Sequence, residues 1–253
     1  MELKLTDVVV ERPTKTVYKE NDKIVKLFVE NYLASNILNE ALNHARVQEG
    51  TDLNVPKLLE VSKVNNRWAI VMERVEGKTL EQLMAENPQK ENEYLNLFVD
   101  IQLNILSKNV PLLNRIKDKF KRKLTNAKNI DEHTKYELLH RLEGMKDHTK
   151  LCHGDLNPSN IIIAPNGDYH IIDWAHVTQG NASADVARTY LLFSMQGKTE
   201  LADKYLNLFV EKSGIEKSNI QNWIPIVAGT QLTKGISEEQ EFLKKWINIF
   251  DYQ

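Results

Sequence analysis

A short segment in the second half of the chain carries the side chains best suited to chemistry. It holds two carboxylates and one amide, Asp155, Asn160 and Asp173. Carboxylate and amide oxygens are hard ligands that suit Mg²⁺, which takes one or two carboxylates beside substrate phosphates. Phosphoryl transfer needs such a metal to neutralise charge, and a carboxylate to orient the nucleophile. If the three side chains converge, they indicate phosphoryl transfer.

A predicted β-hairpin would make them converge. Two β-branched runs are joined through Asn166-Gly167, the dipeptide most typical of a tight hairpin turn. The first run follows Asn160 and the second ends at Asp173, so we expect the folded hairpin to bring these residues together with Asp155. The alternative is a plain polar turn before a hairpin, since such residues are common in turns.

The first part of the chain reads as strands with one helix. Five β-branched or aromatic runs, separated by turn residues, predict antiparallel strands at 8–10, 16–18, 23–28, 57–61 and 68–72. Between the third and fourth runs, apolar residues recur at helical spacing and predict a helix over about 31–48. The expected order is βββαββ, ending near Gly77.

Beyond Lys78 the apolar residues recur at helical spacing in long stretches, and only the hairpin interrupts this pattern. We therefore expect an α+β chain with a mainly helical second part. The formal net charge of -2 gives no overall field that would favour nucleic acid or an anionic membrane. No window is apolar enough for a membrane span, and the single cysteine fits a reducing, cytoplasmic compartment.

The catalytic-type segment resembles a known family. His153-Gly154-Asp155, with Asn160 five positions after the aspartate, is similar to the catalytic loop of the aminoglycoside phosphotransferase and choline kinase superfamily. Ile172-Asp173-Trp174 resembles that family's second metal-binding motif. Gly154 stands where protein kinases have arginine, which favours small-molecule kinases.

The resemblance implies a protein-kinase-like fold of two lobes, with a nucleotide-binding lobe over 1–77 and a catalytic, substrate-binding lobe over 78–253. It implies ATP and Mg²⁺ as cofactors, with Asp155 as the catalytic residue and Asn160 and Asp173 as metal ligands. It also implies that Lys26 contacts nucleotide phosphates and that Glu40 is its partner.

The same resemblance also implies that the backbone groups of Glu73 and Val75 would bond adenine.

The assignment of Glu40 has support that is independent of the resemblance. Glu40 lies on the apolar face of its helix, where a carboxylate is costly unless it is paired. The alternative for Lys26 and Glu40 is a simple surface pair.

Part of the pattern departs from the family. The segment Arg12 to Val17, at the position of the nucleotide loop, contains no glycine. This departure motivates an alternative function, a nucleotide-binding pseudokinase or regulatory module. The preferred function is a kinase that phosphorylates a hydroxyl of a small molecule such as an aminoglycoside, choline or a sugar.

Two charged clusters have no role in this scheme. Six basic residues between Arg115 and Lys123 suit an acidic substrate or nucleic acid, but we interpret them as a solvated helix face. The acidic cluster at 238–241 suits either a cationic substrate or a helix start. We expect no nucleic-acid or membrane partner, and neither the acceptor nor the oligomeric state follows from the sequence.

Overall fold

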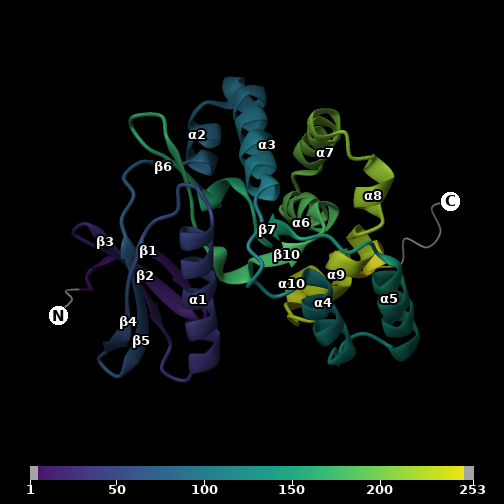
Figure 1. The fold of residues 1–253 in the computed structure, drawn as a ribbon, viewed down its shortest axis with the longest axis horizontal. Helices are drawn as coiled ribbons and strands as arrows, with labels where there is room; N and C mark the ends of the chain where they lie inside the picture. Colours follow the sequence, from purple (N-terminus) through teal and green to yellow (C-terminus); the bar gives the residue numbers. More distant parts are fainter. Residues whose placement is uncertain (1–4, 248–253) are drawn as a thin grey trace. The chain divides into compact units, whose positions relative to one another are not determined.

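The computed structural model describes residues 5–247, which form two compact units (Figure 1). The first unit contains the residues up to Pro88 together with Pro158–His176. The second contains Gln89–Asn157 and the residues from Val177 onward. The hairpin at the centre of the sequence prediction therefore packs with the N-terminal residues.

A five-stranded antiparallel sheet forms most of the first unit, in the order β1-β2-β3-β5-β4. Its strands are β1 (Asp7–Arg12), β2 (Lys15–Glu20), β3 (Lys23–Phe28), β4 (Leu58–Val64) and β5 (Arg67–Glu73). The β4–β5 turn is formed by Asn65 and Asn66, whose φ angles are 49° and 63°. Two consecutive positive φ angles are what a tight hairpin turn requires, and asparagine tolerates them better than most residues.

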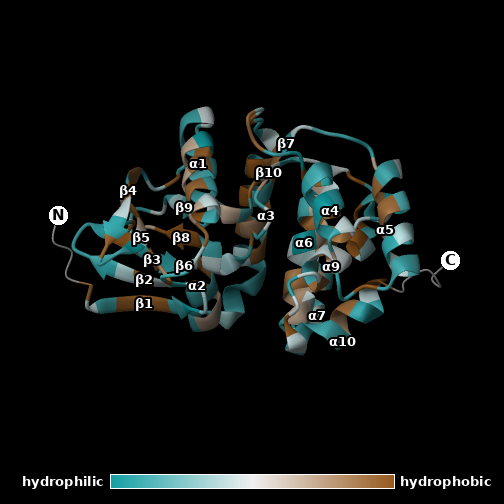
Figure 2. Cartoon of the chain, turned by 90° about the horizontal axis from the view of Figure 1, so that it is seen from below, coloured by the Kyte–Doolittle hydropathy of each residue, from teal (hydrophilic) through white to brown (hydrophobic). Residues whose placement is uncertain are grey.

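Helix α1 (Ala34–Gly50) packs against this sheet. Its residues Ile37 and Ala41 are buried against Phe28 and Ile70 of the strands. The edge strand β1 is different, because its three valines are exposed; Figure 2 shows it as an apolar strand.

A second, three-stranded sheet completes the first unit, in the order β6-β8-β9. The strands are β6 (Lys78–Thr79), β8 (Ile161–Ile163) and β9 (Tyr169–Ile171). Gly77, just before β6, has φ +143°, and a Cβ there would lie 2.2 Å from the Ile163 carbonyl oxygen. Only glycine fits that approach. Helix α2 (Leu80–Glu86) follows, and Thr79 and Gln82 cap it reciprocally.

Helices dominate the second unit. They are α3 (Glu91–Ser107), α4 (Ile116–Thr125), α5 (Glu132–Gly144), α6 (Ala182–Met195), α7 (Thr199–Ser213), α8 (Lys217–Gln221), α9 (Ile224–Leu232) and α10 (Ser237–Ile247). Helix α9 is buried along its whole length and contacts α4, α5, α6, α8 and α10. A short two-stranded sheet pairs β7 (Lys150–Cys152) with β10 (Thr178–Gly180).

The expected fold class is confirmed, including the βββαββ order and the hairpin inside the second half. The hairpin closes through Asn166 and Gly167, where the Gly167 N–H donates to the Ala164 carbonyl at 2.9 Å. Within residues 5–247, no helix is both long and apolar enough to cross a membrane.

Candidate active site

Three residues from separate segments meet in the first unit. Lys26 Nζ on β3 lies 2.7 Å from Glu40 Oε1 on α1 and 2.9 Å from Asp173 Oδ1 after β9. Only 8% of the Lys26 surface is exposed. An ammonium group buried this far is stable only with partners. The surface-pair interpretation of Lys26 and Glu40 is therefore wrong.

The charges of this network favour the ammonium form of Lys26. Burial acts to lower the pKa of Lys26, but the carboxylates of Asp173 and Glu40 outweigh it and raise the pKa above its ordinary value. Lys26 is therefore a fixed positive charge held between two carboxylates.

A second lysine, from the glycine-free segment at the position of the nucleotide loop, reaches the same carboxylates. Lys15 Nζ on β2 lies 3.3 Å from Glu40 Oε1 and 3.6 Å from Asp173 Oδ1. In the β2–β3 pairing, Lys26 lies opposite Val17, two residues from Lys15. Because side chains alternate across a strand, Lys15 and Lys26 share one face of the sheet. Strand periodicity combined with the register could have identified it.

Asp173 itself adopts an unusual backbone conformation. Its φ of +62° is left-handed, which costs a residue other than glycine about 1–2 kcal/mol. Such strain persists where surrounding contacts compensate for it, often at functional sites. Here Lys15 and Lys26 hold the carboxylate that this conformation presents.

The hairpin brings Asn160 and Asp173 together, as predicted. The Ile172 N–H donates to the Asn160 carbonyl at 3.0 Å, and Asn160 is buried. Asp155, the third member of the predicted set, belongs to the second unit. Its convergence with the other two stays a prediction.

The predicted adenine-binding segment follows β5. The Glu73 N–H donates to the Lys57 carbonyl and the Arg74 N–H to the Asp22 carbonyl, both at 2.9 Å. Among the described residues, the Val75 N–H has no such acceptor. Val75 is half-buried, and its amide can donate to a ligand acceptor.

Asp155 lies in a loop that helix α6 supports. The Gly154 N–H donates to Asp185 Oδ1 at 2.7 Å, and Arg188 Nη2 donates to Asp155 Oδ1 at 2.8 Å. Thr189 Oγ1 donates to the Leu156 carbonyl at 2.9 Å. Consecutive turns of one helix thus hold the loop and orient its carboxylate.

Asp185 supports the loop from a costly position. Burial raises the pKa of the Asp185 carboxyl, and hydrogen bonds from the backbone of Gly154 and His153 oppose that rise. Neither Asp185 nor Arg188 was among the predicted site residues. Their roles depend on which residues the folded loop places opposite α6.

Three other side chains are structural. His153 and Cys152 are fully buried. His44 Nε2 lies 2.6 Å from the Pro56 carbonyl oxygen, and burial lowers the pKa of His44. None of these side chains is placed as a nucleophile.

Comparison with known families decides the class of protein. The model of the family described as "Phosphotransferase enzyme family" matches residues 15–213, which is most of the chain. This chain belongs to the phosphotransferase enzyme family. The predicted resemblance and the predicted enzyme class are therefore confirmed.

Solved structures similar to this phosphotransferase share its fold at low sequence identity. A thermostable mutant of aminoglycoside phosphotransferase APH(4)-Ia, in a ternary complex with ADP and hygromycin B, is 11% identical with a TM-score of 0.73. The match covers 97% of this chain and 93% of that chain. Choline kinase LicA from Streptococcus pneumoniae is 14% identical with a TM-score of 0.60, over 96% of this chain and 88% of that chain. No curated protein sequence matches the phosphotransferase.

Proposed function

We propose that the chain transfers the γ-phosphoryl group of ATP to a hydroxyl of a small-molecule acceptor. The observation that carries this proposal is the position of Lys26 between Glu40 and Asp173. A buried lysine that shares its charge between a helix carboxylate and a carboxylate after a hairpin is suited to nucleotide phosphates. The structurally similar aminoglycoside phosphotransferase APH(4)-Ia forms a complex with ADP and hygromycin B, which supports the proposal of a nucleotide and a hydroxyl acceptor for this chain.

Four residues are assigned to the nucleotide. Lys26 contacts the α- and β-phosphates, and Glu40 holds the Lys26 ammonium in place. The Glu73 carbonyl and the Val75 N–H bond the adenine edge. Among residues 5–247, no backbone carbonyl accepts a hydrogen bond from the Val75 N–H, which supports this assignment.

Asn160 and Asp173 are the proposed Mg²⁺ ligands. Within the described part of the chain, no three His, Cys, Asp or Glu side chains are grouped to hold a metal. An amide and one carboxylate nevertheless fit Mg²⁺, which keeps several waters and binds substrate phosphates alongside one or two carboxylates. Asp173 already has a cation at Oδ1, the Lys26 ammonium, 2.9 Å away. The metal would supply charge neutralisation on the transferring group.

Asp155 completes the reaction. Its carboxylate accepts the proton of the acceptor hydroxyl as that oxygen bonds to the γ-phosphorus and the bond to the ADP oxygen breaks. The products are ADP and the phosphorylated acceptor. Arg188, at 2.8 Å from Oδ1, orients the carboxylate for this step.

Two variants with a matched control test the proposal. Lys26→Met should weaken AMP-PNP binding in calorimetry, and Asp155→Ala should retain AMP-PNP binding but lose ATP turnover with an acceptor. The control is Lys19→Met, on the neighbouring strand, where Lys19 Nζ lies 3.9 Å from Oδ2 of the exposed Asp7.

The outcomes separate the two functions. Mg²⁺-dependent nucleotide binding with no turnover over a broad acceptor panel would favour the pseudokinase. Normal phosphotransfer by Asp155→Ala would show that Asp155 is not the proton acceptor.

A further inference from the structure

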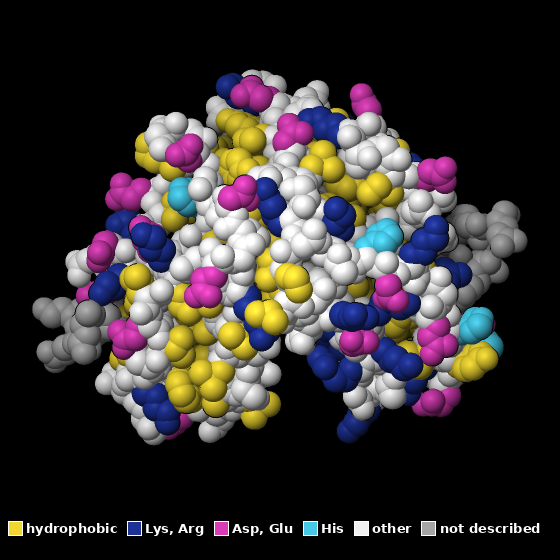
Figure 3. All heavy atoms as spheres, viewed as in Figure 1, with side chains coloured by type: hydrophobic (Ala, Val, Ile, Leu, Met, Phe, Trp, Pro, Cys, Tyr) yellow, Lys and Arg dark blue, Asp and Glu magenta, His cyan; other side chains and the backbone are white. Residues whose placement is uncertain are grey.

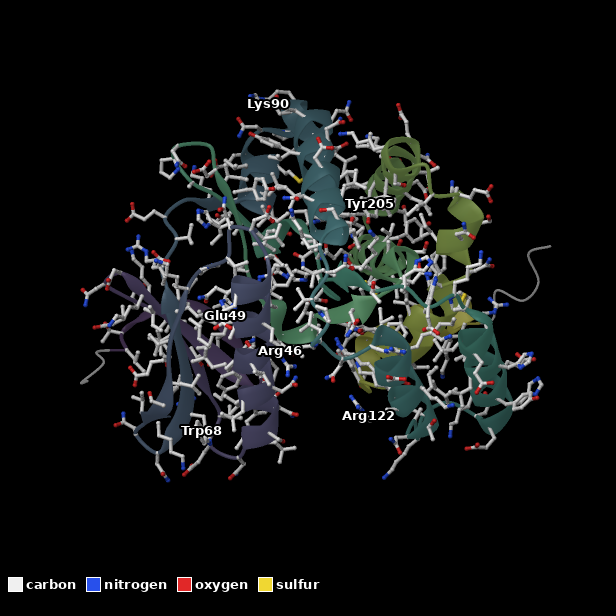
Figure 4. The ribbon with its side chains drawn as sticks, viewed as in Figure 1. Arg46, Glu49, Trp68, Lys90, Arg122 and Tyr205 are labelled. Carbon is white, nitrogen blue, oxygen red and sulfur yellow. The ribbon has the colours of Figure 1, made fainter. Side chains whose placement is uncertain are left out.

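The basic run on α4 is divided by the fold into three groups. Lys117 and Lys121 lie on one side of the buried stripe, where Lys117 contacts Asp147 at 3.5 Å and Lys121 contacts Glu143 at 3.4 Å. Arg122 is exposed and points outward (Figure 4). Figure 3 shows Lys and Arg side chains gathered over α4.

Lys119 and Lys123 lie on the other side of the stripe. They are four residues apart, so they project from one helix face. Both are partly buried rather than solvated. The solvated-face interpretation of the run therefore does not apply to these two lysines.

The charges around Lys119 and Lys123 come from other helices of the same unit. Lys234 follows α9, Arg188 belongs to α6, and the carboxylate within this group is that of the proposed catalytic residue, Asp155. We call Lys119, Lys123, Lys234 and Arg188 the cationic cluster. Cations gathered in a partly buried site repel one another, and an anion would relieve that repulsion.

Burial, and after it the neighbouring cations, lower the pKa values of Lys119 and Lys123. Burial is the largest cause that lowers the pKa of Lys119 to about 7, and the neighbouring cations add to it. Burial and the same neighbours lower the pKa of Lys123 to about 8. An anionic ligand would offset the repulsion and favour the ammonium form of both lysines.

Arg188 adds an independent geometric observation. More than nine-tenths of its surface is buried, and one terminal nitrogen, Nη2, donates to Asp155. Its other terminal nitrogen, Nη1, is buried and has no hydrogen-bond partner within the described residues. A guanidinium presents donors in a fork that matches carboxylate and phosphate.

We infer that the acceptor of this phosphotransferase carries an anionic group, a carboxylate or a phosphate, which the cationic cluster binds beside Asp155. The inference rests on the proposed function, because Asp155 marks where the acceptor hydroxyl must lie. Aminoglycosides and choline are cations, and like charges at a recognition site disfavour binding.

The acidic cluster on α10 bears on one cation of the cationic cluster, Lys234. Glu239 lies in the first turn of the helix and accepts a hydrogen bond from Gln231 at 2.6 Å. It also acts on Lys234 as an opposing charge. Its position supports the helix-start interpretation of the acidic residues.

Matched pairs of acceptors test the inference. ATP turnover of the full chain is measured with glycerol 3-phosphate against glycerol, with D-glycerate against glycerol, and with glucose 6-phosphate against glucose. Choline and kanamycin are the cationic comparison. We expect kcat/KM for at least one anionic compound to exceed that of its neutral partner about tenfold or more.

Variants then assign the effect to the cluster. Lys119→Met and Lys123→Glu should raise KM for the anionic acceptor about tenfold or more, whereas the matched control on the same helix, Lys121→Met, should not. The Kd for AMP-PNP should be the same in Lys119→Met and Lys123→Glu as in the native chain. An equal loss of AMP-PNP affinity would overturn the inference, because the cluster would then serve the nucleotide.

A binding measurement tests the inference even if the true acceptor is not among the compounds assayed for turnover. The three anionic compounds are titrated into the chain with AMP-PNP and Mg²⁺ by calorimetry, and at least one should bind in a manner lost in Lys119→Met. If none binds, or if choline or kanamycin is preferred, the inference is wrong. If the native chain phosphorylates a cationic acceptor and Lys26→Met loses this turnover, the proposed function stands although the inference fails. If the native chain does not bind AMP-PNP, the proposed function itself is wrong.

Discussion

Removing the Asp185 carboxylate is the sharpest test of how α6 supports the catalytic loop. Asp185 is 1% exposed, and the backbone N–H of Gly154 donates to it at 2.7 Å. Hydrogen bonds from the His153 backbone and the Gln102 side chain also lower the pKa of this carboxyl. Asp185→Ala leaves the Gly154 and His153 N–H groups buried without this acceptor, whereas Gln102 keeps Thr189 as a hydrogen-bond partner.

The expected cost follows from those two bonds. A hydrogen bond to a charged group contributes about 1.5–3 kcal/mol, so losing two lowers the free energy of unfolding by about 3–6 kcal/mol. For a chain of this length each kcal/mol lowers Tm by about 2–4 °C, which predicts a fall of about 6–24 °C. Because the same loop carries Asp155, kcat should fall roughly 100-fold even at temperatures where the variant is folded.

Asp185→Asn separates the hydrogen bonds from the charge. The amide oxygen can still accept from Gly154, and its NH₂ group replaces Oδ2, which has no hydrogen-bond partner among the described residues. The pKa of Asp185 is raised above its ordinary value of 3.8, so its contribution to stability is greatest below that pH and declines as pH rises through the folded-state pKa. The unfolding free energy of the native chain relative to Asp185→Asn should therefore decrease as pH rises from about 3.8.

Urea unfolding at several pH values, together with ATP turnover, measures these effects. Glu211→Ala removes an exposed carboxylate from α7 and serves as the control, with an expected change within about 0.5 kcal/mol. If Asp185→Ala were as stable as Asp185→Asn, the buried N–H groups would not depend on this carboxylate and the reasoning would be refuted.

Three further predictions concern the remaining structure. Cys152 is fully buried and burial raises its pKa, so a thiol reagent at pH 8 should label it only after unfolding; rapid labelling of the native chain would contradict this. Gly180→Ala would place a Cβ 2.2 Å from Ile116 Cγ2, which should lower the free energy of unfolding by about 1–3 kcal/mol in urea, and by less in an Ile116→Ala background. Val9→Lys on the exposed edge strand should reduce aggregation in light scattering without changing Tm, and an unchanged aggregation onset would show that this edge does not self-associate.

Local elements of the fold were predictable because their signals are local. The Asn65-Asn66 and Asn166-Gly167 turns fix hairpins through backbone conformations that few other residues adopt. The helix that carries Glu40 was predicted from apolar spacing alone, about three residues displaced at its start. The recognisable catalytic segment added the family and the enzyme class.

What the sequence by itself determined is the set of hairpins and helices, the family, and the residue types available for phosphoryl transfer. Only the tertiary structure decided which charges meet. Lys15 joins Lys26 through strand register, and α6 places Asp185 against the loop that carries Asp155. On α4, Lys119 and Lys123 lie in a different environment from the other basic residues between Arg115 and Lys123. The charges around these two lysines belong to segments that are distant in sequence. The spacing of residues in the sequence predicts which side chains share one helix face. The net charge of a site, however, depends on every element that packs around it.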